Sequence, residues 1–180
     1  MDKQILSLRE KVRLYRTSPV IFLHIDTTGL GMDDEIVRLT IIADDTLVYD
    51  EVFNSSREAN TQALRASGLT NAEIQESTTF LKDEISIIED MIRDKLIVCI
   101  NDNFTRKYLL KAGFNIHNNN LLDLTQATDY FAKGTIKSAY DAMSFYGHDA
   151  DKSRNTFERN FIFYDCACKL KLMANTLLKN

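Results

Sequence analysis

The spacing of apolar residues predicts that the chain opens with an amphipathic helix and continues into strands. Residues 3 to 16 carry apolar side chains at three- and four-residue steps, which is the period of one helix face. Pro19 ends this helix, and the nearly continuous apolar run over residues 20 to 25 is typical of a buried strand. Two more strands are expected at residues 36 to 43 and 46 to 53, which would complete an antiparallel meander.

From residue 58 the apolar period changes to that of helices interrupted by two short strands. These strands are expected at residues 96 to 100 and 121 to 124. Asn71 is expected to cap one helix, and Gly113 to end another. The helices are predicted at residues 59–66, 71–75, 79–92, 104–111, 125–132, 136–146 and 156–178. A meander followed by alternating helix and strand indicates an α/β fold, with a mixed sheet flanked by helices.

Composition favours an ordinary globular protein. With 180 residues, 44% of them hydrophobic, one domain is expected over residues 1 to 180, with an amphipathic helix over 1 to 18 and a core over 19 to 180. The net charge of −4 argues against tight, nonspecific duplex binding, which needs clustered Lys and Arg. The cysteines lack zinc-type spacing, and no signal peptide or membrane span of roughly 20 apolar residues is evident. A cytoplasmic protein is expected.

Four short motifs follow one another along the chain. Residues 22–30 read FLHIDTTGL, residues 68–70 read GLT, residues 97–105 read IVCINDNFT and residues 160–167 read NFIFYDCA. In this order, and on these expected elements, they resemble the motifs of the DEDD 3′–5′ exonucleases. This DnaQ-like superfamily includes RNase T and the DNA polymerase III epsilon subunit. The resemblance covers roughly residues 20 to 178 and implies an RNase H-like fold.

The resemblance also implies where a catalytic site would lie. In these enzymes four carboxylates bind two divalent ions, which generate hydroxide and stabilise phosphoryl displacement. The corresponding positions in this chain are His24, Asp26, Thr105 and Asp165. The general-base position falls on Asn160, or on Phe161 if the chain follows the Tyr-type subfamily. Neither of these side chains accepts a proton at neutral pH.

Charge at these positions decides whether hydrolysis is expected. Two divalent ions carry +4, whereas Asp26 and Asp165 together supply only −2. Each uncompensated unit of charge at contact distance costs on the order of ~4 kcal/mol near a partly buried site. We therefore expect an inactive or severely impaired site with no cofactor, or with one weakly bound Mn²⁺ or Mg²⁺ at these two aspartates. Asp102 is expected to cap a helix, and Asp123 to end a strand in solvent, so that neither completes the site.

The binding residues are better preserved than the catalytic ones. The resemblance implies contacts with a terminal nucleotide from Thr27, Thr28, Gly29, Leu30, Asn101 and Phe104. Phe104 is alternatively a core residue. We expect a noncatalytic protein that binds the 3′ end of single-stranded DNA or RNA, or a replication or processing protein. Two alternatives stay open: an active metal-dependent 3′–5′ exonuclease with an atypical site at His24, Asp26 and Asp165, and a structural partner subunit.

Overall fold

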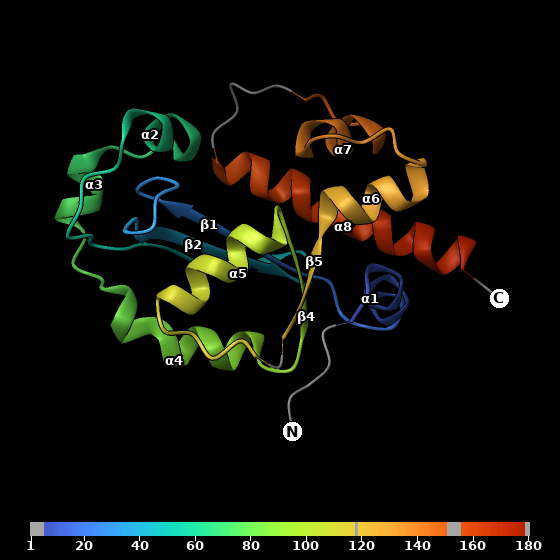
Figure 1. The fold of residues 1–180 in the computed structure, drawn as a ribbon, viewed down its shortest axis with the longest axis horizontal. Coiled ribbons are helices and arrows are strands. Elements are labelled where there is room, and N and C mark those ends of the chain that lie inside the picture. The colour runs from blue at the N-terminus through green and yellow to red at the C-terminus, as the bar shows by residue number, and fades with distance from the viewer. Residues whose placement is uncertain (1–5, 118, 151–155, 179–180) are drawn as a thin grey trace.

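A five-stranded mixed sheet forms the centre of the structure, a computed structural model that describes residues 6–117, 119–150 and 156–178 (Figure 1). The strands are β1 (Ile21–Thr27), β2 (Ile36–Ala43), β3 (Thr46–Val52), β4 (Leu96–Cys99) and β5 (Asn120–Asp123). They lie in the order β3-β2-β1-β4-β5. The first three pair antiparallel, whereas β4 pairs parallel with β1 and β5 pairs parallel with β4. The predicted sheet, a meander extended by parallel strands, is confirmed.

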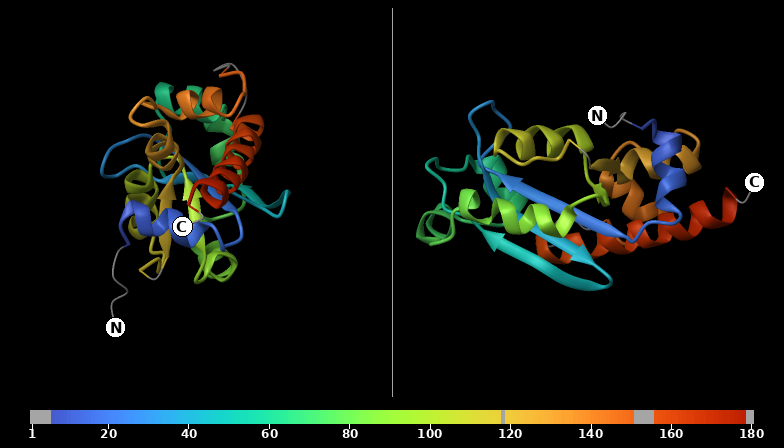
Figure 2. Two further views of the ribbon diagram at one scale, coloured as in Figure 1. Left: turned by 90° about the vertical axis from the view of Figure 1, so that its right-hand side faces the viewer. Right: turned by 90° about the horizontal axis from the view of Figure 1, so that it is seen from below.

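Helices cover both faces of this sheet (Figures 1 and 2). They are α1 (Leu8–Tyr15), α2 (Thr61–Ser67), α3 (Asn71–Glu76), α4 (Leu81–Ile92), α5 (Asp102–Lys111), α6 (Leu124–Ala132), α7 (Ala139–Phe145) and α8 (Thr156–Leu177). Helices α4 and α5 pack on one face, and α8 crosses the other beside α1, α6 and α7. Within the described ranges, no helix is long and apolar enough to span a membrane.

Strand β1 is buried on both faces, which explains its almost unbroken apolar sequence. Phe22 packs towards α8, where its ring centroid lies 6.2 Å from that of Phe163. Leu23, which points the opposite way, belongs to the hydrophobic cluster under α4 and α5. Because side chains alternate along a strand, His24 and Asp26 share the α8 face with Phe22. This alternation places two polar side chains between the sheet and α8.

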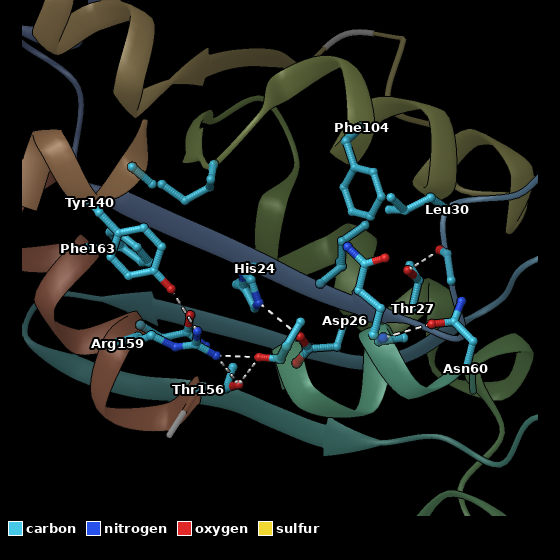
Figure 3. Close-up of a pocket in the computed structure, with 18 residues that line it drawn as sticks. His24, Asp26, Thr27, Leu30, Asn60, Phe104, Tyr140, Thr156, Arg159 and Phe163 are labelled. Atoms are coloured by element: carbon cyan, nitrogen blue, oxygen red, sulfur yellow. Dashed lines mark hydrogen bonds and ion pairs between the residues drawn. The ribbon is translucent and has the colours of Figure 1, made fainter. Parts of the chain in front are cut away.

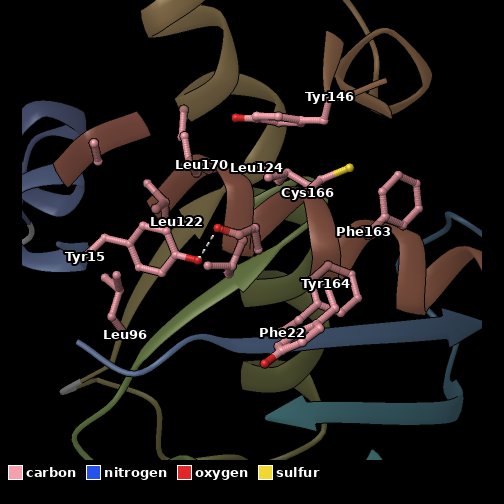
Figure 4. Packing of buried hydrophobic residues seen from close by; sticks show 14 of the residues in the cluster. Tyr15, Phe22, Leu96, Leu122, Leu124, Tyr146, Phe163, Tyr164, Cys166 and Leu170 are labelled. Carbon is pink, nitrogen blue, oxygen red and sulfur yellow. Dashed lines mark hydrogen bonds between the residues drawn. The ribbon is translucent and has the colours of Figure 1, made fainter. Parts of the chain in front are cut away.

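Helix α1 is fixed to α8 by buried contacts (Figure 4). Val12 and Tyr15 have no exposed surface and join the cluster formed with α8. The Tyr15 hydroxyl donates a hydrogen bond to the carbonyl of Ala167 at 2.8 Å. The Arg16 guanidinium donates to the carbonyl of Leu178 at 2.7 Å. The amphipathic N-terminal helix therefore packs as part of the main hydrophobic cluster.

Side-chain caps place some helix starts differently from the predictions. Helix α1 begins at Leu8, where Ser7 forms a capping box, and residues 3 to 5 of the predicted helix lie outside the described residues. Thr70, rather than Asn71, caps α3. The Asn71 side chain instead accepts a backbone N–H from the segment before α2 at 2.8 Å. Its amide is therefore used in a tertiary contact that local sequence does not reveal.

The expected roles of Asp102 and Asp123 are both wrong. Asn101, in a left-handed conformation with φ 58°, caps α5, and Asp102 is the first residue of that helix. The Asp102 carboxylate lies 3.3 Å from Nζ of Lys11. Asp123 is only 6% exposed and caps α6 by accepting a backbone N–H at 3.0 Å. Burial raises the pKa of Asp123, although its backbone hydrogen bonds act in the opposite direction.

A polar cluster on α8 holds the segment that follows α7. The Asp165 carboxylate lies 2.6 Å from Nε2 of His148 and 2.8 Å from Nζ of Lys169. Burial alone would raise the pKa of Asp165, but the hydrogen bonds from Lys169 and His148 outweigh it and lower the pKa below its ordinary value of 3.8. Lys169 also donates to the carbonyl of Tyr146 at 3.1 Å. Asp165 therefore has a structural role at this position.

Replacing Tyr15 by Phe tests the contact between α1 and α8. The change removes the buried hydroxyl that donates to Ala167 while keeping the ring. We expect the free energy of unfolding to fall by about 1 kcal/mol, the usual net value of such a bond. Urea denaturation of both proteins measures the difference. The control is Tyr130→Phe, at a ring that is 41% exposed, which should leave stability unchanged within error.

Replacing Asp165 by Asn tests the polar cluster through pH. A carboxyl whose pKa is lowered in the folded state stabilises the protein above its unfolded pKa, and this contribution disappears as pH falls through the folded value. The stability difference between wild type and Asp165→Asn should therefore be present at neutral pH and be lost as the pH falls through the lowered pKa of the folded state. Thermal unfolding across this range measures it. Asp149→Asn, an equal charge change at an exposed neighbour, should not reproduce the pattern.

Candidate functional site

A pocket of about 290 Å³ lies where the carboxyl end of β1 meets α8 (Figure 3). Its walls come from β1, the loop after β1, α2, the start of α5, α7 and the first turns of α8. Ligand pockets commonly begin near 300 Å³, so this pocket has room for a small group such as one terminal nucleotide unit. Eight of its eighteen lining residues have apolar side chains: Ile25, Leu30, Ala63, Ala66, Ile100, Phe104, Ala139 and Phe163.

His24 and Asp26 form the polar floor of the pocket. Nε2 of His24 lies 3.3 Å from Oδ1 of Asp26, and Figure 3 shows the two side chains facing one another. Asp26 is 8% exposed, and its Oδ2 has no hydrogen-bond partner among the described residues. A buried carboxylate oxygen without a donor is costly. This oxygen is therefore available to a ligand that carries a hydrogen-bond donor.

Asn160 and Arg159 provide the polar wall on α8. Asn160 is 1% exposed, and within the described part of the chain neither Oδ1 nor Nδ2 has a partner. An unsatisfied buried polar group costs about 1–3 kcal/mol. Arg159 donates to the Tyr140 hydroxyl at 3.1 Å and to Oγ1 of Thr156 at 3.0 Å. The guanidinium is thus held in place, whereas the Asn160 amide lacks a partner.

The start of α8 is tied to the end of α2 across one rim of the pocket. The Thr156 hydroxyl bonds to the carbonyls of Ser67 at 2.5 Å and Ala66 at 3.2 Å. Arg159 donates to the same Ala66 carbonyl. These bonds use carbonyls that a helix leaves unpaired at its end. Two helices almost 90 residues apart in sequence are therefore joined where the pocket opens.

The loop after β1 is held rigidly and presents Leu30 to the opening. The Thr27 hydroxyl bonds to the carbonyl of Gly29 at 2.6 Å, and the Tyr108 hydroxyl donates to the same carbonyl at 3.1 Å. A Cβ at Gly29 would lie 2.5 Å from the side-chain ends of Asn60 and Asp34, so a larger residue there would require these two side chains to move. Leu30 is 68% exposed. The loop therefore offers an apolar side chain on a fixed backbone.

The pocket brings together some of the predicted site residues. Its lining includes His24, Asp26, Thr27, Gly29, Leu30, Phe104 and Asn160. Thr28 is fully buried beside Asp34, to which its hydroxyl donates at 2.9 Å. Thr105 is 2% exposed, and Asn101 is used as a helix cap. Phe104 combines its two predicted roles, because it lines the pocket and also packs on Tyr108 with ring centroids 4.7 Å apart.

Asp165 does not line the pocket, and the structure does not bring it to Asp26. Both Asp165 and Asn160 lie on α8, five residues apart. Five helical residues correspond to a rotation of roughly 140°, so the two side chains point to different sides. Asn160 faces the pocket and Asp165 faces His148 and Lys169. Sequence analysis also missed Arg159 and Tyr140, because their partners come from separate helices.

The residues present do not fit a pair of divalent ions. Asp26 is the only carboxylate among the described residues that line the pocket. No group of three or more His, Cys, Asp or Glu side chains within the described ranges is placed to hold a metal ion. The single negative charge of Asp26 offsets only a quarter of the +4 charge of two divalent cations. The His24 ring nitrogen and the Asn160 side-chain oxygen could act as metal ligands, but neither adds a negative charge that would offset the rest.

Comparison with known proteins identifies similarities of structure alone. No family model matches the sequence, and no curated protein matches it. Zinc-bound exonuclease I of Escherichia coli in complex with single-stranded DNA is similar, with a TM-score of 0.62, 13% identity, and coverage of 87% of this chain and 41% of that chain. The same enzyme with a dT13 oligonucleotide gives a TM-score of 0.62 at 14% identity, with the same coverage.

Exonuclease X, in complex with 5′ overhanging duplex DNA, gives a TM-score of 0.58 at 15% identity, covering 87% of this chain and 92% of that chain. The chain thus spans about two fifths of exonuclease I and nearly all of exonuclease X. Its mixed sheet flanked by helices is the RNase H-like fold of the DnaQ-like exonucleases.

Proposed function

We propose that the chain binds the 3′ end of a single-stranded nucleic acid in the pocket beside β1 and does not cleave it by two-metal hydrolysis. The observation that carries the proposal is a pocket at the end of β1, in an exonuclease fold, with Asp26 as its only described carboxylate. The site is a degenerate version of a DEDD centre. Its shape and apolar walls suit a nucleotide, but its charge does not suit two cations.

Binding is supported by the walls of the pocket. Leu30 stands exposed at the opening, and Phe104 and Phe163 line the interior. Stacking of a base on an aromatic side chain such as Phe104 contributes about 1–3 kcal/mol and tolerates every base, because each base has a π-face. Structural neighbours of the same fold are complexes with single-stranded DNA and with overhanging duplex DNA. A strand end is therefore the ligand that best fits this fold and this lining.

Loss of hydrolysis is supported by the chemistry of the polar residues. The family's general-base position falls on Asn160, and an amide does not take a proton from water at neutral pH. Asp165, the other carboxylate expected at the centre, is engaged by His148 and Lys169 outside the pocket. One weakly held Mn²⁺ or Mg²⁺ at Asp26 is the most that this set of donors supports. The alternative partner is a replication or processing protein, and it becomes the proposed partner only if no nucleic acid binds.

End binding is tested with fluorescently labelled single-stranded DNA and RNA. Linear oligonucleotides with a free 3′ hydroxyl should bind with higher affinity than circularised oligonucleotides of the same sequence, measured by fluorescence anisotropy. Leu30→Ala should weaken binding by about fivefold to tenfold, because apolar surface that the bound nucleotide would cover is lost. Leu177→Ala, at a leucine that is 62% exposed near the end of α8, is the matched control. Equal affinity for linear and circular strands would contradict the proposal.

A nuclease assay tests the absence of hydrolysis. We expect the same oligonucleotides to remain intact on denaturing gels after incubation with Mg²⁺, Mn²⁺ or Zn²⁺, because the pocket lacks the carboxylates that hold two ions. The control variants are Asp26→Asn, inside the pocket, and Asp165→Asn, outside it. A ladder of products that disappears in Asp26→Asn, whether or not it persists in Asp165→Asn, would show a working atypical site and contradict the proposal.

Adding a carboxylate at position 160 should increase metal affinity. In the variant Asn160→Asp a second negative charge faces the pocket that holds Asp26. We expect Mn²⁺ to bind at least about tenfold more tightly than to wild type, because opposite charges at contact distance gain several kcal/mol near a protein surface. Isothermal titration calorimetry measures the affinity. Asn115→Asp, on an exposed residue remote from the pocket, should change it little; equal affinities in all three proteins would refute the charge deficit.

A further inference from the structure

We infer that Asn160 and Arg159 hold a phosphate of the bound strand end, so that the pocket recognises a nucleotide without divalent cations. The inference rests on the proposed function and names the group that is recognised. Cations fit this pocket poorly, because Asp26 is its only described carboxylate. The two α8 side chains instead provide hydrogen-bond donors at the same pocket. The described lining thus has few groups that bind a cation and two side chains that can donate hydrogen bonds directly to an anion.

The Asn160 amide is the first observation. It is 1% exposed, it lines the pocket, and neither of its polar atoms has a partner among the described residues. Buried amides are almost always hydrogen-bonded in folded proteins, so an exception calls for a bound group. The Nδ2 atom is a donor that a phosphate oxygen satisfies. An apolar residue would fill this place with less cost to folding, which is why the amide points to a ligand.

The Arg159 guanidinium is the second observation. It is the only permanent positive charge among the described residues of the lining. The Tyr140 hydroxyl and the Thr156 hydroxyl hold its two terminal nitrogens, at 3.1 Å and 3.0 Å. An arginine fixed in this way loses little side-chain entropy when an anion arrives, and its planar group matches phosphate oxygens. Figure 3 shows it between Tyr140 and Thr156 at the wall of the pocket.

Asp26 sets a further requirement on the ligand. Its Oδ2 is buried without a donor in the described structure, and a phosphate alone would leave it unsatisfied. A sugar hydroxyl is the donor that a nucleotide adds. One terminal nucleotide therefore offers a hydroxyl for Asp26 and a phosphate for Asn160 and Arg159. A nucleoside offers only the hydroxyl. A comparison of a nucleoside with its monophosphate therefore tests the phosphate contact directly.

The test compares thymidine 5′-monophosphate with thymidine by calorimetry in EDTA. Wild type should bind the monophosphate at least about tenfold more tightly, which corresponds to ~1.4 kcal/mol. Asn160→Leu should lose most of this preference while its melting temperature stays equal or rises, because an unpartnered amide has been removed. Arg159→Gln should also lose the preference. Arg93→Gln, on an exposed arginine of the turn after α4 that pairs with Asp90, should retain it.

The outcomes separate this inference from the proposed function. A monophosphate that binds no better than thymidine, or an Asn160→Leu variant that keeps the full preference, overturns the phosphate role. Equal losses of affinity for thymidine and for thymidine 5′-monophosphate in Asn160→Leu would assign the amide to a base edge and also overturn the phosphate role. Oligonucleotide ends that bind only with added Mg²⁺ or Mn²⁺ would leave end binding standing while refuting cation-free recognition. Oligonucleotides that bind in no buffer would refute the proposed function itself.

Discussion

The burial of β1 on both faces is the constraint on which the rest of the structure depends. Helices pack on both faces of this strand, so its register in the sheet is fixed. A register shift by one residue would turn Phe22 and Leu23 away from their hydrophobic clusters. That direction also fixes His24 and Asp26 on the α8 face. The polar floor of the pocket is therefore held in register by the apolar packing of the residues that immediately precede it on β1.

Electrostatics then decides what this geometry is suited to do. In a fold shared with metal-dependent enzymes, the described lining carries one carboxylate, one guanidinium and one imidazole. Such a lining is close to neutral. A neutral pocket attracts a phosphodiester far better than a pocket with four carboxylates does when no cation is present. A lining with one carboxylate therefore repels a nucleic-acid backbone less than a lining with four carboxylates would.

Sequence alone predicted the fold well and the site only in part. Strands and helices were predicted near their observed bounds because apolar periodicity follows from burial, as the strands at residues 36–43 and 121–124 show. The family resemblance implied the site positions of His24 and Asp26. The orientation of α8 could not be predicted, since that helix is apolar on several sides, and Asp165 was therefore expected at the site together with Asn160. The burial of Asp123 and the hydrogen bonds of Arg159 to Tyr140 and Ala66 depend on contacts between separate segments, which no local pattern encodes.

The bonds between the end of α2 and the start of α8 have a consequence for how the pocket forms. Thr156 meets Ser67 across 89 residues of sequence, and this contact closes one rim of the pocket. Contacts between such distant residues form only after a large loss of chain entropy, and hence late in folding. A partly folded chain that has only the local meander of β1, β2 and β3 would lack a closed pocket. The pocket is thus complete only in the fully assembled domain, and any ligand that enters it requires the finished fold.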